Sequence, residues 1–345
     1  MLKGKIANLW NIPASLIIVV LFFIGCGGKS GPAVNVRIGW RSTHPLQGQL
    51  IQSLKKTDIL NQYPLSVDFK GFDDAMNLNE AARTGQLDVV LTDAHSAVKL
   101  LSLDDNWTII GRVSYDRIPL YVPRESSIKA ISDLKRKRIA GVIPGTVLQR
   151  EAFKALQTAG LDPGRDVKYV DRPVKDWNRV HAQISTDPAA AELEAEGKIR
   201  NLYVGKGVSI ILIANSFIET HSQVVPALLE AFLDANLYVA KNPEKAAEWF
   251  QEEAGLQLSP KALRICASLE PNYRAWMKGH VSMNLSELDL EALQAAADFI
   301  KEQNPVEKGV DMQAHVDLHY LREAEKSWWG RRDIEPKIVG GESAP

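Results

Sequence analysis

Short apolar runs alternate with amphipathic segments over the first third of the chain. Residues Val34–Trp40 alternate apolar and polar positions, as a half-buried strand does, and a polar break and a helical pattern to about Lys56 follow. Strand patterns return at Leu65–Phe69, Leu87–Leu91, Trp107–Val113 and Ile118–Val122. This β–α alternation predicts an α/β fold whose parallel strands are covered by helices on both faces.

A second α/β series begins near Ser132, with a helix expected at Val147–Ala159. Strands are expected at Arg138–Ile143, Asp166–Val170, Ile199–Val204 and Val208–Ala214, and after Gln223 the pattern is helical. A chain of 345 residues exceeds the size at which one core usually keeps growing, so we expect two lobes. The expected division is residues 34–118 plus 206–310 for lobe 1, 119–205 for lobe 2, and 311–345 for a C-terminal helix and tail.

The N-terminus predicts export. Lys3 and Lys5 precede the apolar stretch Ala14–Ile24, which is short for a membrane span, so residues 1–25 are predicted to be a signal peptide. The alternative is an uncleaved anchor or a buried apolar helix. Phe23–Cys26 resembles the bacterial lipobox, which implies a lipid on Cys26, a flexible leash over 26–33, and a periplasmic or cell-surface lipoprotein held at a membrane.

Composition excludes several classes of function. The formal charge is −1 and no long basic stripe occurs, so nucleic acid is not an expected partner. Cys26 and Cys266 stand far apart and outside any CxxC pattern, and the seven histidines are scattered. We therefore predict no metal site and no cofactor.

Three stretches carry a resemblance to a known family. They are Ala81–Val89, Ser127–Ala140, and the spaced residues Gly145, Thr146, Leu156, Ala159–Leu161 and Asp166–Val167. Together they resemble bacterial solute-binding proteins of the nitrate, taurine and aliphatic-sulfonate group, which also includes binders of thiamine-pyrimidine precursors. The resemblance implies a two-lobed periplasmic binding protein fold, type II-like, with a ligand cleft between the lobes. It also implies delivery of a small solute to an ABC permease and its ATPase.

Two positions depart from the family pattern. Arg136 stands where the family has a glycine, and no clear strand precedes the turn at Asp187–Pro188. The contribution of residues 177–188 to the pocket is therefore left open, although Asp187 is included among the expected ligand-binding residues.

The remaining candidate site residues follow predicted strands or begin a predicted helix. Ligands of open α/β sheets gather at the carboxyl ends of strands, where Arg41 offers a charged fork and Trp40 a ring that either stacks on a ligand or belongs to the core. Thr92 offers a hydroxyl group, and Asp93 either binds ligand or caps the next helix. The other candidates are Ser42, Thr43, Gly145 and Thr146.

The predicted function is capture of a small, anionic solute such as a sulfonate or nitrate, without enzymatic chemistry. No Gly-x-Ser-x-Gly elbow or zinc-peptidase pair occurs. Two alternatives remain open: an exported enzyme acting on a small anion or a pyrimidine in the cleft, and a binding protein that serves a sensor. Asp93 also keeps amine-bearing ligands open, because a carboxylate repels an anion.

Overall fold

The computed structural model describes residues 33–305 and 308–339, and these belong to one compact unit. The predicted signal peptide, the lipidation site Cys26 and most of the predicted leash lie outside the described residues.

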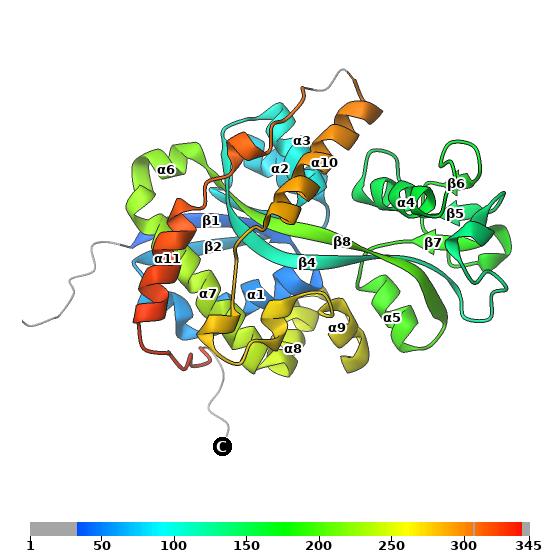
Figure 1. The fold of residues 1–345 in the computed structure, drawn as a ribbon. Coiled ribbons are helices and arrows are strands. Elements are labelled where there is room, and N and C mark those ends of the chain that lie inside the picture. Colours follow the sequence, from blue (N-terminus) through cyan, green and yellow to red (C-terminus); the bar gives the residue numbers. More distant parts are fainter. Residues whose placement is uncertain (1–32, 306–307, 340–345) are drawn as a thin grey trace, which may run out of the picture. The chain divides into compact units, whose positions relative to one another are not determined.

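Eight strands of the described chain form one sheet in the order β2-β1-β3-β8-β4-β7-β5-β6 (Figure 1). Their bounds are β1 (Val34–Arg41), β2 (Leu65–Phe72), β3 (Val89–Asp93), β4 (Trp107–Pro123), β5 (Arg138–Ala140), β6 (Lys168–Val170), β7 (Ala182–Ile184) and β8 (Ile199–Ala214). The α/β fold class is confirmed.

The sheet is mixed, so the expectation of purely parallel strands is wrong. Strand β1 runs parallel to β2 and β3, and β5 runs parallel to β6 and β7. Strand β8, however, is antiparallel to both β3 and β4, and β4 is antiparallel to β7. The two longest strands thus lie side by side, in opposite directions, in the middle of the sheet (Figure 1).

Each of these long strands had been expected as two short ones. Strand β4 continues through the polar stretch Ser114–Arg117, and β8 continues through Gly205–Gly207. Their pairing contains register shifts at Ile109/Gly111, Arg112/Ser114 and Leu120/Tyr121. Polar residues interrupt the apolar pattern there because their side chains form contacts of their own.

Eleven α-helices of the described chain surround the sheet. They are α1 (Pro45–Lys56), α2 (Ala75–Arg83), α3 (Ala94–Leu103), α4 (Val147–Thr158), α5 (Ala189–Ala195), α6 (Asn215–His221), α7 (Val225–Lys241), α8 (Pro243–Ala254), α9 (Pro260–Cys266), α10 (Glu287–Gln303) and α11 (His319–Gly330). Figure 1 shows α2, α3 and α10 on one side of the long strands and α1, α7 and α8 on the other. None of these helices has the length and apolar character needed to cross a bilayer.

Local sequence explains where several helices begin and end. Proline occupies the first turn of α1, α7, α8 and α9, where its missing N–H is not needed. Helix α10 begins with a capping box in which Ser286 and Asp289 accept each other's backbone N–H. Gly255, with φ of 62°, ends α8 in the left-handed region.

Buried apolar side chains form two main clusters. The larger cluster joins β1, β3 and the first part of β4 to α1, α3, α7, α10 and α11. The smaller cluster joins the second part of β4 to β5, β7 and α4. Both clusters therefore share β4, and the polar stretch Ser114–Arg117 lies between its two apolar parts.

Strand β7 answers the question left open for residues 177–188. It is only three residues long, but it pairs with both β4 and β5, so the sheet does continue into this segment. The Asp187–Pro188 turn follows it directly, with a cis peptide bond.

Candidate functional site

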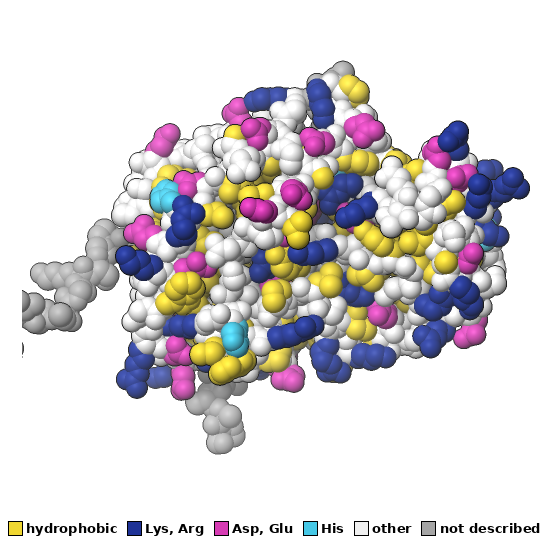
Figure 2. Space-filling view, viewed as in Figure 1, with side chains coloured by type: hydrophobic (Ala, Val, Ile, Leu, Met, Phe, Trp, Pro, Cys, Tyr) yellow, Lys and Arg dark blue, Asp and Glu magenta, His cyan; other side chains and the backbone are white. Residues whose placement is uncertain are grey.

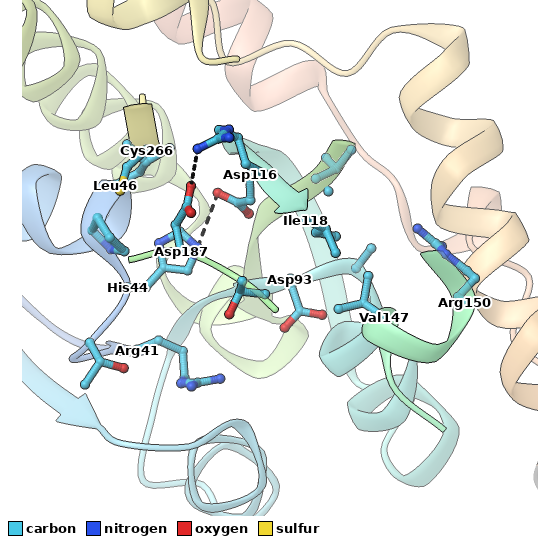
Figure 3. A pocket seen from close by; sticks show the side chains of 17 residues that line it. Arg41, His44, Leu46, Asp93, Asp116, Ile118, Val147, Arg150, Asp187 and Cys266 are labelled. Carbon is cyan, nitrogen blue, oxygen red and sulfur yellow. Dashed lines mark hydrogen bonds and ion pairs between the residues drawn. The ribbon is translucent and has the colours of Figure 1, made fainter. Parts of the chain in front are cut away.

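A pocket of about 120 Å³ lies where β1 and β3 end, beside the middle of β4 and the start of α4 (Figure 3). The start of α1, the middle of β8, the segment that follows β7 and one residue of α9 complete its wall. Polar side chains that line it are Arg41, Thr43, His44, Asp93, Asp116, Arg117, Arg150, Thr186, Asp187 and Cys266.

Arg41 is the last residue of β1, and it reaches the pocket with spare hydrogen-bonding capacity. Its Nη2 donates to the backbone oxygen of Asp73 at 3.1 Å, while its buried Nε has no partner. Thr43, from the same loop, also lines the pocket. Because buried polar groups in proteins are normally satisfied, the free Nε–H marks a place where a ligand acceptor fits.

Asp93 caps the next helix, which is one of the two roles considered from the sequence. Its Oδ1 accepts the N–H groups of His95 and Ser96 at the start of α3, and its Oδ2 accepts the Ser96 hydroxyl at 2.7 Å. The same residue lines the pocket. Its acceptor capacity is thus largely used by the helix that it caps.

Asp116 is held by three neighbours. Its Oδ1 accepts the Ser114 hydroxyl at 2.8 Å and lies 3.2 Å from Nε2 of His44, and its Oδ2 accepts the Ser209 hydroxyl at 2.6 Å. Burial acts to raise the pKa of Asp116, but His44 and the two hydroxyls outweigh burial and the pKa is lowered. This carboxylate is therefore charged and already satisfied.

Asp187 is held much less well. Its Oδ2 accepts a bond of 3.4 Å from Nη1 of Arg117, whose Nη2 donates to Glu194 at 2.6 Å instead. Its Oδ1 is buried without a partner. Burial raises the pKa of Asp187 to about 6, because Arg117 and the backbone N–H of Ala191 oppose the effect only in part and the charges of Glu194 and Asp116 add to it.

The start of α4 contributes Val147 and Arg150 rather than the predicted Gly145 and Thr146. Arg150 donates to Glu151 at 3.1 Å and to the backbone oxygen of Ala292 at 3.1 Å. Gly145 donates its N–H to Gln149, and the Thr146 hydroxyl donates to the backbone oxygen of Ile143. Neither predicted residue is among those that line the pocket.

Three other predicted residues also point elsewhere. Trp40 is buried in the larger cluster, with 1% of its surface exposed. It is therefore a core residue, which was the second of the two alternatives. The Ser42 hydroxyl donates to Asp73 at 2.8 Å. Thr92 is fully buried and its Oγ1 has no partner, but it does not line the pocket. The structure thus brings Arg41, Thr43, Asp93 and Asp187 together.

Sequence reasoning missed Asp116, Arg117 and Arg150. The first two lie in the stretch of β4 that reads as a loop, and Arg150 lies inside a helical pattern. The partners that position them are distant in sequence, as Arg117 and Asp187 show with a separation of 70 residues. No local pattern identifies such residues.

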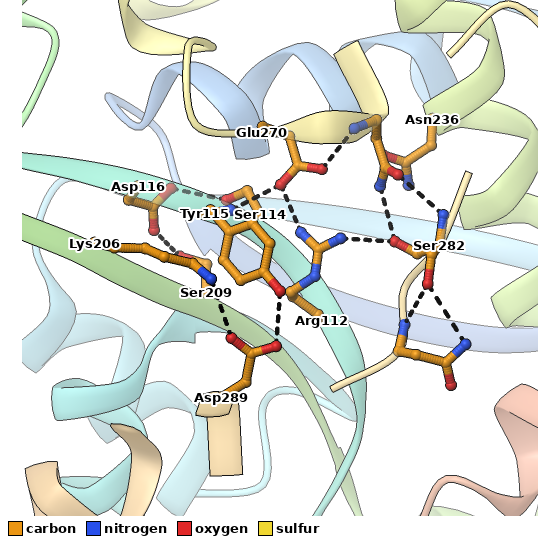
Figure 4. A network of polar contacts seen from close by, with 12 residues as sticks. Arg112, Ser114, Tyr115, Asp116, Lys206, Ser209, Asn236, Glu270, Ser282 and Asp289 are labelled. Carbon is orange, nitrogen blue, oxygen red and sulfur yellow. Dashed lines mark hydrogen bonds and ion pairs between the residues drawn. The ribbon is translucent and has the colours of Figure 1, made fainter. Parts of the chain in front are cut away.

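A network of polar contacts continues from Asp116 along β4 (Figure 4). Arg112 forms a buried ion pair with Glu270, which also accepts the N–H groups of Tyr115 and Asn272. The Tyr115 hydroxyl donates to Asp289 at 2.7 Å. Arg112 and Lys206 of β8 both lie over the Tyr115 ring, at 4.0 and 3.4 Å from its centre.

The described residues include no cluster of three or more His, Cys, Asp or Glu side chains suited to a metal ion. The cysteine in the pocket wall, Cys266, is unpaired and buried, and burial raises the pKa of its thiol. Its thiolate is therefore disfavoured at neutral pH.

The distribution of charge on the surface agrees with the near-neutral composition, because Figure 2 shows Lys and Arg interspersed with Asp and Glu on the face it displays.

The fold is that of periplasmic binding proteins. The chain resembles the periplasmic aliphatic sulphonate binding protein of Escherichia coli, with a TM-score of 0.68, 17% identity, and coverage of 90% of this chain and 95% of that one. It also resembles the alkanesulfonate-binding protein of Xanthomonas axonopodis pv. citri bound to MOPS, with a TM-score of 0.63, 18% identity, and coverage of 83% and 99%. The predicted resemblance to sulfonate-binding proteins is thus confirmed at the level of structure.

An enzyme shares this fold. A desulfurization enzyme solved in complex with biphenyl-2-sulfinic acid has a TM-score of 0.64 and 14% identity, with coverage of 85% of this chain and 99% of that one. No protein-family model and no curated protein sequence matches the chain. At these identities the likeness concerns the fold, and function has to be argued from the pocket.

Proposed function

We propose that the protein is the solute-binding component of an ABC importer and that its solute binds in the pocket between the two hydrophobic clusters. The observation that carries the proposal is the pair of buried, unpartnered polar atoms in the pocket wall, Arg41 Nε and Asp187 Oδ1. Buried polar atoms of this kind are costly unless a ligand satisfies them.

The solute bears an acidic head group that Arg41 binds through its Nε–H. A guanidinium fork suits the oxygens of a sulfonate or carboxylate better than a lysine does. The solute is also small, since a cavity of about 150 Å³ holds a molecule the size of benzene and this pocket measures about 120 Å³.

The proposal includes the division into lobes expected from the sequence. Lobe 1 comprises residues 34–118 plus 206–310 and lobe 2 residues 119–205, with residues 311–345 as C-terminal helix and tail. Arg41 and Asp93 belong to the first lobe and Arg150 and Asp187 to the second, so a solute that touches all four favours the closed state of the lobes. Export by residues 1–25, a lipid on Cys26 and delivery to a permease and its ATPase complete the proposal.

An enzymatic role is the second candidate, because a desulfurization enzyme shares the fold and Cys266 reaches the pocket. The raised pKa of the Cys266 thiol argues against it as a nucleophile. We therefore expect binding without conversion.

The experiment is a thermal-shift screen of the chain from Gly27 onward against taurine, alkanesulfonates, nitrate, bicarbonate, aromatic carboxylates and thiamine-pyrimidine precursors. A saturable rise in Tm identifies the solute class by mass action. The bound solute is then recovered and examined by mass spectrometry. Unchanged solute supports a binding protein, whereas its conversion, lost in Cys266→Ser, supports the enzyme; absence of any shift argues against the proposed solutes.

A further inference from the structure

The Asp187 carboxylate has acceptor capacity that no protein group uses. Only 8% of its side chain is exposed, and one oxygen receives a single long bond from Arg117. The other oxygen has no partner in hydrogen-bonding geometry, although the backbone N–H of Ala191 lies close enough to lower the pKa of the carboxyl group. Arg117 donates its shorter bond, of 2.6 Å, to Glu194. An ionised carboxylate offers about four acceptor positions, so Asp187 is prepared to accept more.

The other charged groups around the pocket are already committed. Asp116 is bound by two hydroxyls and lies against His44, and Asp93 caps α3. Arg150 is held by Glu151. Arg41 therefore remains as the donor with a free N–H, and Asp187 as the acceptor with a free oxygen.

An anion without a donor group fits this arrangement poorly. It satisfies Arg41 but adds a further negative charge to a small cavity whose wall already contains Asp93, Asp116 and Asp187. Like charges at short range in a poorly hydrated site repel each other strongly. The raised pKa of Asp187 indicates that its protein neighbours do not compensate its charge fully.

We propose that the solute carries a protonated nitrogen that donates to Asp187, in addition to the acidic group bound by Arg41. This inference rests on the proposed function and narrows it, because it replaces a simple anion by a small zwitterion. Figure 3 shows Asp187 and Asp116 on one side of the pocket and Arg41 away from them, which separates the two charges of the ligand.

The test compares pairs of solutes that differ only in the amine: taurine with ethanesulfonate, 3-aminopropanesulfonate with propanesulfonate, and β-alanine with propionate. Affinities are measured by isothermal titration calorimetry for the wild type, for Asp187→Asn, and for a control, Asp171→Asn, whose exposed side chain is not in the pocket wall. In the wild type and the control we expect the amine-bearing member of at least one pair to bind about 10- to 100-fold more tightly, as charge-assisted hydrogen bonds do. In Asp187→Asn the preference should fall to about threefold or less.

Each other outcome overturns the inference. Equal binding of both members in every pair that binds leaves the solute-binding function standing and excludes the amine contact. If Asp187→Asn still binds the amine-bearing member of a pair more tightly to the same degree, then a group other than Asp187 binds the amine. If no member of any pair binds a wild-type protein shown to be folded by its cooperative thermal unfolding, then the inference and the proposed solute class both fail.

Discussion

Strand β4 carries two buried arginines, each paired with a carboxylate, and we call a pair complete when both carboxylate oxygens are bonded. The two pairs differ in this respect, although Arg112 Nε is itself buried without a partner. Arg112 bonds Glu270 at 2.5 Å, and both oxygens of Glu270 accept further backbone N–H groups. Arg117 bonds Asp187 at only 3.4 Å, and one oxygen of Asp187 has no partner. Burial is similar in both pairs, so burial alone does not separate a structural ion pair from a binding site. The number of satisfied acceptor positions does.

The largest effect is expected from breaking the complete pair. Arg112→Ala leaves Glu270 buried with an uncompensated charge, which costs about 3–5 kcal/mol of unfolding free energy. Urea denaturation at pH 7 measures this loss. The matched control is Arg83→Ala, because Arg83 forms an exposed pair with Glu80 and its removal should hardly matter. A similar, small effect of both substitutions would contradict the structural role of the Arg112–Glu270 pair.

The incomplete pair should respond in the opposite direction. Asp187→Asn keeps the size of the side chain but removes its carboxyl group, whose pKa is raised from 3.8 to about 6 in the folded protein. That difference corresponds to roughly 3 kcal/mol. Well below pH 3.8 the carboxyl is protonated in both states, and the wild type loses stability as the pH rises from below 3.8 to about 6, because the unfolded state ionises first.

The solute-free Asp187→Asn protein should therefore be more stable than the wild type at pH 7, and most of the gain should be lost by pH 4. Urea denaturation at several pH values between 4 and 7 measures the difference. A gain that is the same at every pH would mean that the charge of Asp187 is not its cause, and a loss at pH 7 would mean that Arg117 depends on Asp187 more than on Glu194.

A smaller effect should come from the edge of the complete network. Tyr115→Phe removes the hydroxyl that donates to Asp289, while Asp289 retains Ser286 and Lys206 as partners. We expect a loss of about 1 kcal/mol, the usual contribution of one hydrogen bond. Thermal unfolding measures it. A loss as large as that of Arg112→Ala would show that the network acts as one unit instead of as separable bonds.

The smallest expected effect lies outside both pairs. Arg136 adopts φ of 60°, a left-handed conformation that favours glycine. Arg136→Gly should raise the unfolding free energy by about 0.5–1 kcal/mol, since the relief of strain exceeds the entropic cost of glycine. Unlike the gain of Asp187→Asn, this one should not vary between pH 4 and pH 7. A pH-dependent gain would point to the charge of Arg136 in place of its backbone.

Arg136 also illustrates what the sequence could predict. The family resemblance predicts a glycine at this position. The structure gives the physical reason, because the turn requires a positive φ at residue 136. The helical character of the chain after Gln223 was predicted, because apolar periodicity and the N-terminal prolines of α7, α8 and α9 are local signals. The continuity of β4 and β8 was not predictable, since polar residues such as Tyr115 and Lys206 interrupt the apolar pattern. The pairing of the two strands, and the contacts of both side chains with Asp289, involve residues distant in sequence.

The site was predictable in part for the same reason. Arg41 and Asp93 stand at the ends of predicted strands, and the ends of strands are where α/β folds bind ligands. Arg117 gave no such signal, because its role depends on Glu194 and Asp187, which tertiary folding brings to it. Gly145 and Thr146 had the residue types of an anion-binding turn, but the structure directs their polar groups to Gln149 and Ile143.

The buried thiol in the pocket wall has a practical consequence. Cys266 is the only cysteine in the described part of the chain, and just 2% of its surface is exposed. A thiol-specific reagent can reach it only when α9 or its surroundings open, so the rate of labelling reports how often that opening occurs. A solute that fills the pocket should lower the labelling rate. The protein thus contains its own chemical reporter of occupancy, with no dye or tag added to the site.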